Sequence, residues 1–174
     1  MSKYPNINKT REDLLYNNIL LLSRNKLFYT KFNLEDTFHN RINLIFFHVS
    51  FLFAKIKQSD SSESFKKFNQ GMFDLIFLRI EQNMWEIGYG DVVVNKNMKF
   101  LVKNFYNILL NCENFNKRNL ESKNEFLSKY LKTKDIKTSN NNDRLSAYFT
   151  EYCSFCFDLS QDSVLSGKLN FIYK

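Results

Sequence analysis

Apolar residues recur at helical spacing along most of this chain, and few glycines or prolines interrupt them. In the clearest stripe each member lies three or four residues after the last: Phe38, Ile42, Ile45, Val49, Leu52 and Ile56. This spacing places side chains on one face of an α-helix. Only four glycines and one proline occur among 174 residues, which disfavours turn-rich β-sandwiches and barrels. The pattern predicts an all-α fold.

Local signals divide the chain into a polar tail and one helical domain. Thr10 followed by Asp13 is typical of a helix start, and Asp36 with Thr37 predicts another. Gly88 suits the left-handed position that follows a helix end. We predict a polar tail over residues 1–9 and a single-domain bundle of five to seven helices over 10–174. The expected helices cover residues 10–23, 27–32, 38–56, 64–87, 95–112, 120–131 and 143–159.

Four connecting segments are predicted to be non-helical. Val92 to Val94 are β-branched and predict a short strand-like step, after which Asn95 caps the next helix. The other three segments are a Ser-rich acidic loop over 58–63, a polar Asn-rich connection over 132–143 and an irregular tail over 164–171.

The length and the apolar windows indicate a protein that does not span a membrane. A chain of this size buries roughly 70% of its unfolded surface as one domain. The most apolar window, residues 42–54, is shorter than the ~20 residues that a spanning helix requires. The N-terminus lacks a secretory pattern, and three cysteines form no disulfide framework. We therefore predict a protein of a reducing compartment that does not cross a bilayer.

The helix over residues 38–56 is apolar around more than half of its circumference. A second stripe of Leu44, Phe47 and Phe51 accompanies the first, and Phe46 and Phe53 add to it. Two interpretations are open. The helix is either the buried centre of the bundle or it exposes an apolar surface that binds a partner. Helices that are apolar on most sides are normally buried.

Positive charge is concentrated in the middle of the chain. The net charge is +7, of which residues 96–137 carry +6. Lys96, Lys99 and Lys103 are spaced to share one helix face. This face is either a solvated lysine-rich surface or a docking surface for anionic lipid headgroups or ribosomal RNA.

No constellation of catalytic or metal-binding residues is evident. The only histidines, His39 and His48, lie nine residues apart and so on opposite faces of one predicted helix. Cys153 and Cys156 form a Cys-x-x-Cys, but it lies within a helical pattern and has no second pair to complete a zinc site. Cys112 has no obvious partner. We predict no enzymatic activity, no cofactor and no metal.

Several motifs, in order, resemble the ubiquinol–cytochrome c chaperone family. Residues 81–91 read Glu-Gln-Asn-Met-Trp-Glu-Ile-Gly-Tyr-Gly-Asp and, with the Phe-rich residues 71–77, are similar to the family's helix that ends in glycine, apolar residue, glycine, aspartate. Weaker similarities lie at residues 35–38, 47–49, 55–57, 96–99, 104–106, 145–148 and 167–171. The likeness covers residues 27–171, although Asn107 stands where the family usually has glycine.

The resemblance implies an all-α chaperone of the bacterial form that assists assembly of the cytochrome bc1 complex. With it we expect a cytoplasmic protein, peripheral at the inner face of the cytoplasmic membrane. The resemblance also implies newly made cytochrome b as the client and the ribosome or a small helical protein as further partners, while an anionic membrane surface is the partner that the lysine face suggests. We expect no DNA binding. The predicted partner-binding residues are Phe47, His48, Phe51, Asp91, Lys96, Lys99 and Lys103.

Two other hypotheses stay open. The chain could instead be a basic ribosome- or RNA-binding helical adaptor with no role in bc1 assembly, since its lysines are clustered. It could also be a thiol or metal protein that uses Cys153 and Cys156.

Overall fold

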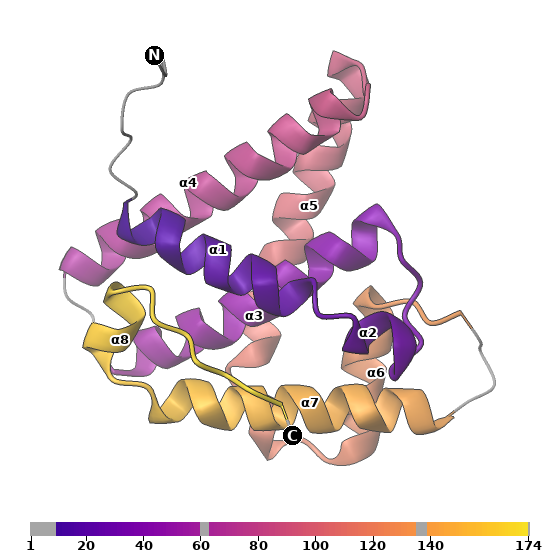
Figure 1. Ribbon diagram of the computed structural model, residues 1–174, viewed down its shortest axis with the longest axis vertical. Coiled ribbons are helices and arrows are strands. Elements are labelled where there is room, and N and C mark those ends of the chain that lie inside the picture. The colour runs from indigo at the N-terminus through magenta and orange to yellow at the C-terminus, as the bar shows by residue number, and fades with distance from the viewer. Residues whose placement is uncertain (1–9, 60–62, 135–138, 174) are drawn as a thin grey trace, which may run out of the picture.

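The computed structural model describes residues 10–59, 63–134 and 139–173, and it is all-α (Figure 1). Within these ranges six helices have eleven residues or more, and two are short. The elements in chain order are α1 (Arg11–Ser23), α2 (Leu27–Thr30), α3 (Phe38–Ser59), α4 (Glu63–Glu86), α5 (Asp91–Cys112), the 3-10 turn η1 (Phe115–Lys117), α6 (Leu120–Tyr130), α7 (Ser139–Asp158) and α8 (Gln161–Leu165). The predicted fold class is confirmed. The predicted tail over residues 1–9 lies outside the described residues.

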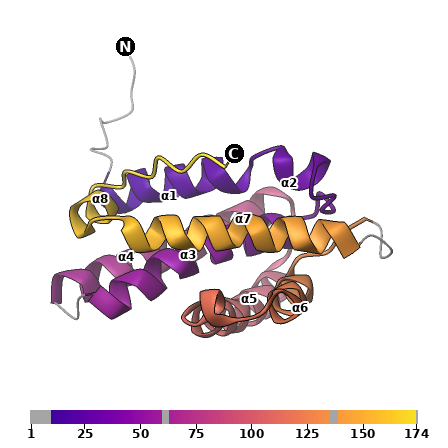
Figure 2. The ribbon, with the colours of Figure 1, turned by 90° about the horizontal axis from the view of Figure 1, so that it is seen from below.

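Helix α3 is the centre of the bundle. It contacts α1, α4, α5 and α7. Figure 2 shows α1 and α2 in one layer, α3, α4 and α7 in the next, and α5 and α6 in the third. The C-terminal segment runs back along α1, where the side chain of Asn18 donates a hydrogen bond to the carbonyl oxygen of Gly167. The two apolar stripes of α3 are covered because a neighbouring helix packs on each side.

The predicted helix starts at Thr10 and Thr37 are confirmed by hydrogen bonds. Thr10 Oγ1 accepts from the backbone N–H of Asp13 at 3.1 Å, and the Asp13 carboxylate accepts from the N–H of Thr10 at 3.2 Å. Thr37 Oγ1 accepts from the N–H of Asn40 at 3.2 Å. Gly88 has a φ of 90°, as predicted for the residue that ends α4. These caps satisfy N–H groups that a helix leaves unpaired.

The prediction of a strand-like step over Val92 to Val94 was wrong. These valines form the first turn of α5, whose N-cap is Gly90, and Asn95 lies inside the helix. β-Branched residues lower helix propensity by only a few tenths of a kcal/mol, so packing of α5 against α3 and α4 overrides the local preference.

The other connecting segments are shorter than predicted. Helix α3 extends to Ser59 and α4 begins at Glu63, so residues 58, 59 and 63 of the expected loop are helical, while residues 60–62 lie outside the described residues. Helix α7 begins at Ser139 and not at Asp143, while residues 135–138 of the expected connection are likewise not described. Helix α8, which was not predicted, ends at Leu165 and so takes up the first two residues of the expected irregular tail. Polar side chains did not stop these helices, because a solvated helix face accommodates them.

Candidate functional site

The predicted partner-binding residues fall into a core group and a surface group. Phe47, His48 and Phe51 are fully buried on α3. The Phe47 ring lies 5.1 Å from that of Phe149, between ring centroids, and the Phe51 ring lies 5.1 Å from that of Phe115. In this arrangement none of the three can touch a client, so the buried-centre interpretation describes α3.

The geometry around His48 indicates a structural role. Its Nδ1 lies 2.6 Å from the carbonyl oxygen of Leu44, which can only accept, so Nδ1 donates. Its Nε2, 2.8 Å from the hydroxyl oxygen of Tyr148, then accepts from that hydroxyl. Desolvation lowers the pKa of His48 from 6.5 to about 4, against the opposing effect of the Leu44 hydrogen bond. The ring is therefore neutral at physiological pH, and both of its nitrogens are hydrogen-bonded within the protein.

The three cysteines are buried thiols. Burial raises the pKa of Cys153 to about 11 and raises the pKa values of Cys112 and Cys156 further. Thiolates are the reactive and metal-binding form, so this environment disfavours both uses. Within residues 10–59, 63–134 and 139–173 no group of three or more His, Cys, Asp and Glu residues is placed to hold a metal ion.

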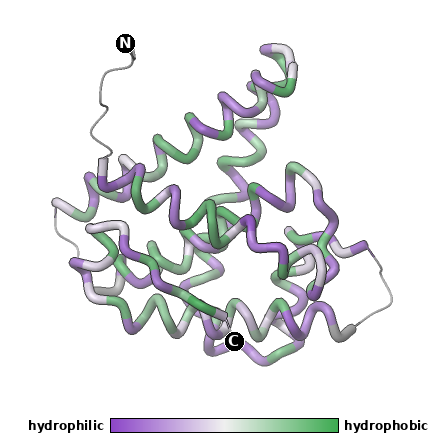
Figure 3. Tube along the Cα trace, in the orientation of Figure 1, coloured by the Kyte–Doolittle hydropathy of each residue, from purple (hydrophilic) through white to green (hydrophobic). Residues whose placement is uncertain are grey.

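The end of the α4–α5 hairpin exposes large apolar side chains. Helices α4 and α5 meet at a corner that projects beyond the rest of the bundle (Figure 1), and hydrophobic residues lie at this corner as well as along the inner helices (Figure 3). We call this surface the hairpin tip; its exposed apolar residues are Trp85, Ile87, Tyr89, Val92 and Val93. Val92 is 82% exposed.

No helix among the described residues is long and apolar enough to span a membrane.

The predicted lysine face is confirmed as a surface of α5. Lys96, Lys99 and Lys103 are all exposed, and Asp91 is exposed in the first turn of the same helix. The carboxylate of Asp91 stabilises α5 because it lies near the positive end of the helix dipole. These four residues lie on α5, the helix that also carries Val92 and Val93 of the hairpin tip.

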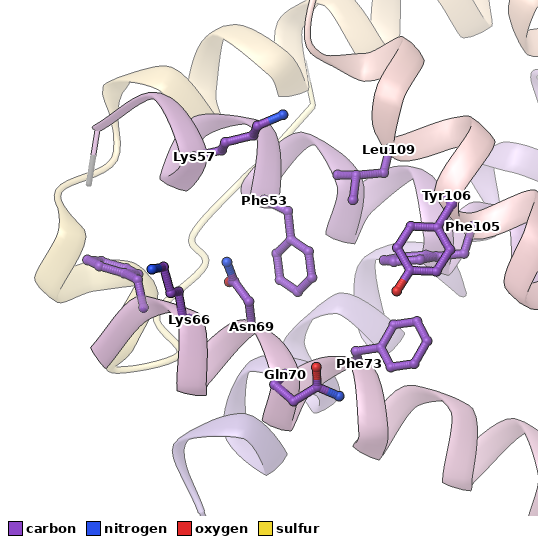
Figure 4. A pocket seen from close by; sticks show the side chains of 10 residues that line it. Phe53, Lys57, Lys66, Asn69, Gln70, Phe73, Phe105, Tyr106 and Leu109 are labelled. Carbon is purple, nitrogen blue, oxygen red and sulfur yellow. The ribbon is translucent and has the colours of Figure 1, made fainter. Parts of the chain in front are cut away.

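An apolar groove of about 380 Å³ opens where α3, α4 and α5 diverge (Figure 4). Half of its lining residues are aromatic, and the Phe73 and Tyr106 ring centroids lie 5.7 Å apart. Tyr106 lies three residues after Lys103 and is also exposed, so the lysine face leads to the rim of the groove. The lining residues are Phe53, Lys57, Phe65, Lys66, Asn69, Gln70, Phe73, Phe105, Tyr106 and Leu109.

Polar groups at the groove differ in whether they have partners. Lys57 Nζ lies 2.6 Å from Glu113 Oε1, and Gln70 Nε2 donates to Asp74 Oδ1 at 2.7 Å. Lys66 forms no ion pair with any described residue. Asn69 Oδ1 is buried and has no hydrogen-bond partner within the described part of the chain. Buried acceptors without a donor are rare and call for an explanation.

Neither the hairpin tip nor the groove was predicted from the sequence. Three consecutive valines after Gly90 cannot all face the core of one helix, and that was a usable signal for exposure. The groove had no such signal, because Phe65, Phe73 and Phe105 share the helical spacing of ordinary core residues.

Comparison with known proteins agrees with the motif resemblance. Residues 30–171 match the model of the ubiquinol-cytochrome C chaperone family. Among solved structures, the fold is similar to that of the crystal structure of the Cbp3 homolog from Brucella abortus, with a TM-score of 0.78 and 19% sequence identity over 94% of this chain and 89% of that chain. A search of curated proteins gives no match.

Proposed function

Because the chain belongs to the ubiquinol–cytochrome c chaperone family, we propose that it is a non-enzymatic chaperone that assists cytochrome bc1 assembly by holding newly made cytochrome b. A newly made membrane protein presents apolar segments that need temporary cover. The chaperone must therefore offer apolar surface that is not already used in its own core.

The exposed apolar surface of the hairpin tip is the observation that carries this proposal. Monomeric soluble proteins rarely expose contiguous apolar patches larger than a few hundred Å² without an interaction role. At this corner five exposed large apolar side chains lie within residues 85–93. Burial of such residues against a client contributes roughly 25 cal/mol per Å² of apolar surface removed from water. We assign client binding to the tip, with Asp91 and the lysine face beside it, and leave out Phe47, His48 and Phe51 because they are buried.

We further propose that the protein acts at the inner face of the cytoplasmic membrane. Lys96, Lys99 and Lys103 are exposed next to the tip, and juxtamembrane lysines gain about 1 kcal/mol each near an anionic leaflet. The chaperone would thereby stay where its client is inserted. The ribosome and a small helical partner protein, which the family resemblance implies, stay predictions.

The triple variant Ile87→Ser/Val92→Ser/Val93→Ser is expected to retain the fold but to hold its client poorly. All three side chains are exposed and serine resembles valine in helix propensity, so stability should change little. Loss of their apolar contacts should lower the cytochrome b recovered with the chaperone by about tenfold. Recovery is measured by affinity purification and by the reduced-minus-oxidised haem b spectrum of membranes.

The matched control is Leu21→Ser, which removes an apolar side chain that is 71% exposed on α1, away from the tip. Wild-type cytochrome b recovery in the triple variant would contradict the assignment of the tip. Unchanged bc1 levels after deletion of the gene would contradict the function itself.

One observation favours a second candidate, an RNA- or ribosome-binding adaptor: the three exposed lysines of α5. If three phosphates are neutralised, affinity for single-stranded RNA should fall about 20-fold between 50 and 200 mM salt. Client binding through apolar contacts should change less than twofold over this range. The dissociation constants for an RNA oligonucleotide and for detergent-solubilised cytochrome b, measured at both salt concentrations, separate the two functions.

A further inference from the structure

A separate cavity of about 520 Å³ lies between the start of α3, the middle of α5 and the end of α6. Its volume is within the range of about 300–1,000 Å³ that is typical of small-molecule sites. Three basic residues line it: His39 from α3, Lys129 from α6 and Lys132 from the segment that follows α6. No Asp or Glu among the described residues lines it, and its other lining residues are neutral.

Two buried asparagines of α3 hold the lysine-bearing backbone in place. Asn40 Nδ2 donates to the carbonyl oxygen of Lys132 at 2.8 Å, and Asn40 Oδ1 accepts from the backbone N–H of Lys132 at 2.9 Å. Asn43 Nδ2 donates to the carbonyl oxygen of Tyr130 at 2.7 Å. These partners lie 92 and 87 positions apart in the chain. The tertiary structure therefore fixes the basic residues of α6 and its C-terminal segment beside the start of α3.

The three basic side chains are accessible to a ligand. His39, Lys129 and Lys132 are all exposed as well as lining the cavity. Neither lysine forms an ion pair with a described residue. Lys129 Nζ lies 5.5 Å from the centroid of the Tyr130 ring, and the His39 and Phe100 ring centroids lie 6.4 Å apart. Because positive groups that share one cavity repel each other, an anion bound between them relieves that repulsion.

The residue types favour phosphate over carboxylate as the anion. Lysine binds phosphate as a point charge, whereas the planar fork of arginine matches a carboxylate, and no arginine among the described residues lines this cavity. A phosphate monoester also carries about −1.5 to −2 charges at pH 7, against a single charge on a carboxylate. Two lysines and a histidine suit the larger charge.

We propose that this cavity binds the phosphate group of a phosphate monoester between Lys129, Lys132 and His39. The site is separate from the hairpin tip, to which client binding is assigned, so the inference goes beyond the proposed function. Two sources can supply such a group: a soluble phosphate ester and the headgroup of a lipid such as phosphatidic acid.

An NMR titration of the full chain with sn-glycerol 3-phosphate tests the site. The His39 ring and the Asn104 side-chain amide both line the cavity, so their signals should shift and saturate. Acetate, which offers a carboxylate in place of the phosphate, should bind at least about tenfold more weakly because of its smaller charge. Uncharged glycerol should cause no shift.

The double variant Lys129→Gln/Lys132→Gln should bind glycerol 3-phosphate about tenfold or more weakly, because each exchange removes a charged hydrogen-bond donor. The matched control is Lys66→Gln/Lys67→Gln, which removes the same charge from exposed positions of α4 that do not line this cavity. Salt screens such distant charges, so the control should bind within about twofold of the wild type. Circular dichroism establishes that both variants fold.

Vesicles distinguish the two sources of the phosphate. A lipid ligand predicts that the wild type sediments with vesicles of equal parts phosphatidylcholine and phosphatidic acid, and that Lys129→Gln/Lys132→Gln does not. A soluble ligand predicts saturable binding of glycerol 3-phosphate that these vesicles do not displace. Either result supports the site and identifies its source.

Equal loss of affinity in the two double variants would reduce the binding to general electrostatic attraction and overturn the proposal. Acetate binding as tight as that of glycerol 3-phosphate, or the lack of saturable shifts at His39 and Asn104, would overturn it as well. These readouts involve neither cytochrome b nor bc1 levels. Failure of this site is therefore distinguishable from failure of the chaperone function, which the gene deletion tests.

Discussion

Phe51→Ala is expected to lower the free energy of unfolding by about 3–5 kcal/mol, the usual cost of emptying a buried phenylalanine site. The ring is fully buried, and its centroid lies 5.1 Å from that of Phe115 and 5.8 Å from that of Phe149. Truncation removes these contacts and leaves a cavity at the centre of the bundle. The effect should therefore appear as lost stability and not as a selective loss of client binding.

Chemical denaturation followed by far-UV circular dichroism measures this change. Phe100→Ala is the control, because Phe100 is about half exposed on α5 and its truncation should cost no more than about 0.5 kcal/mol. A Phe51→Ala variant of wild-type stability that no longer retains cytochrome b would show that Phe51 contacts the client, and would contradict its role in the core.

Acidification from pH 6.5 to pH 4 is expected to remove about 3 kcal/mol of stability through His48 alone. Its pKa is about 4 in the folded protein and near 6.5 in the unfolded chain. Within this range the unfolded chain binds a proton that the folded protein excludes, so stability falls as the pH falls. Each unit of pKa difference corresponds to 1.36 kcal/mol, and below pH 4 the loss stops growing because both states are protonated.

Denaturant unfolding at pH 6.5, 6.0, 5.5 and 5.0 isolates this effect, because ordinary carboxyl groups titrate mainly below this range. The His48→Gln variant keeps hydrogen-bonding capacity without a titrating ring, and its stability should depend less on pH. The His39→Gln variant, a surface change that leaves His48 in place, is the control. Direct titration of the His48 ring by NMR gives the same answer without a variant, and a folded-state pKa near 6.5 would contradict the prediction.

Helix positions were predictable where local chemistry decides them. The capping box of Thr10 and Asp13 and the positive φ of Gly88 involve residues at most a few positions apart, so no distant contact is needed to set them. The same holds for the stripe of α3, since a helical repeat of apolar residues excludes other regular structures. Its length was underestimated by one turn because polar residues end a helix only when a competing cap is available.

The candidate site was less predictable, because exposure depends on which neighbours are present. Phe51 and Val92 are both apolar residues in helices, yet the first is sealed among α3, η1 and α7 and the second projects from the hairpin tip. Asn69 shows the same limit. An asparagine on a helix is ordinarily solvated, and only the packed structure shows that its Oδ1 is buried without a hydrogen-bond partner among the described residues.

The sequence alone determined three things: the all-α fold, the ends of most helices and the family motifs. The fold and the helix ends follow from hydrogen bonds and side-chain periodicity within a few turns. Tertiary structure alone decided that the Phe-rich face of α3 is core, that the tip of α4 and α5 is exposed, and that Asn69 Oδ1 is buried without a donor among the described residues. Burial is a property of the surface that other helices remove from water, and no local pattern specifies which helices those are.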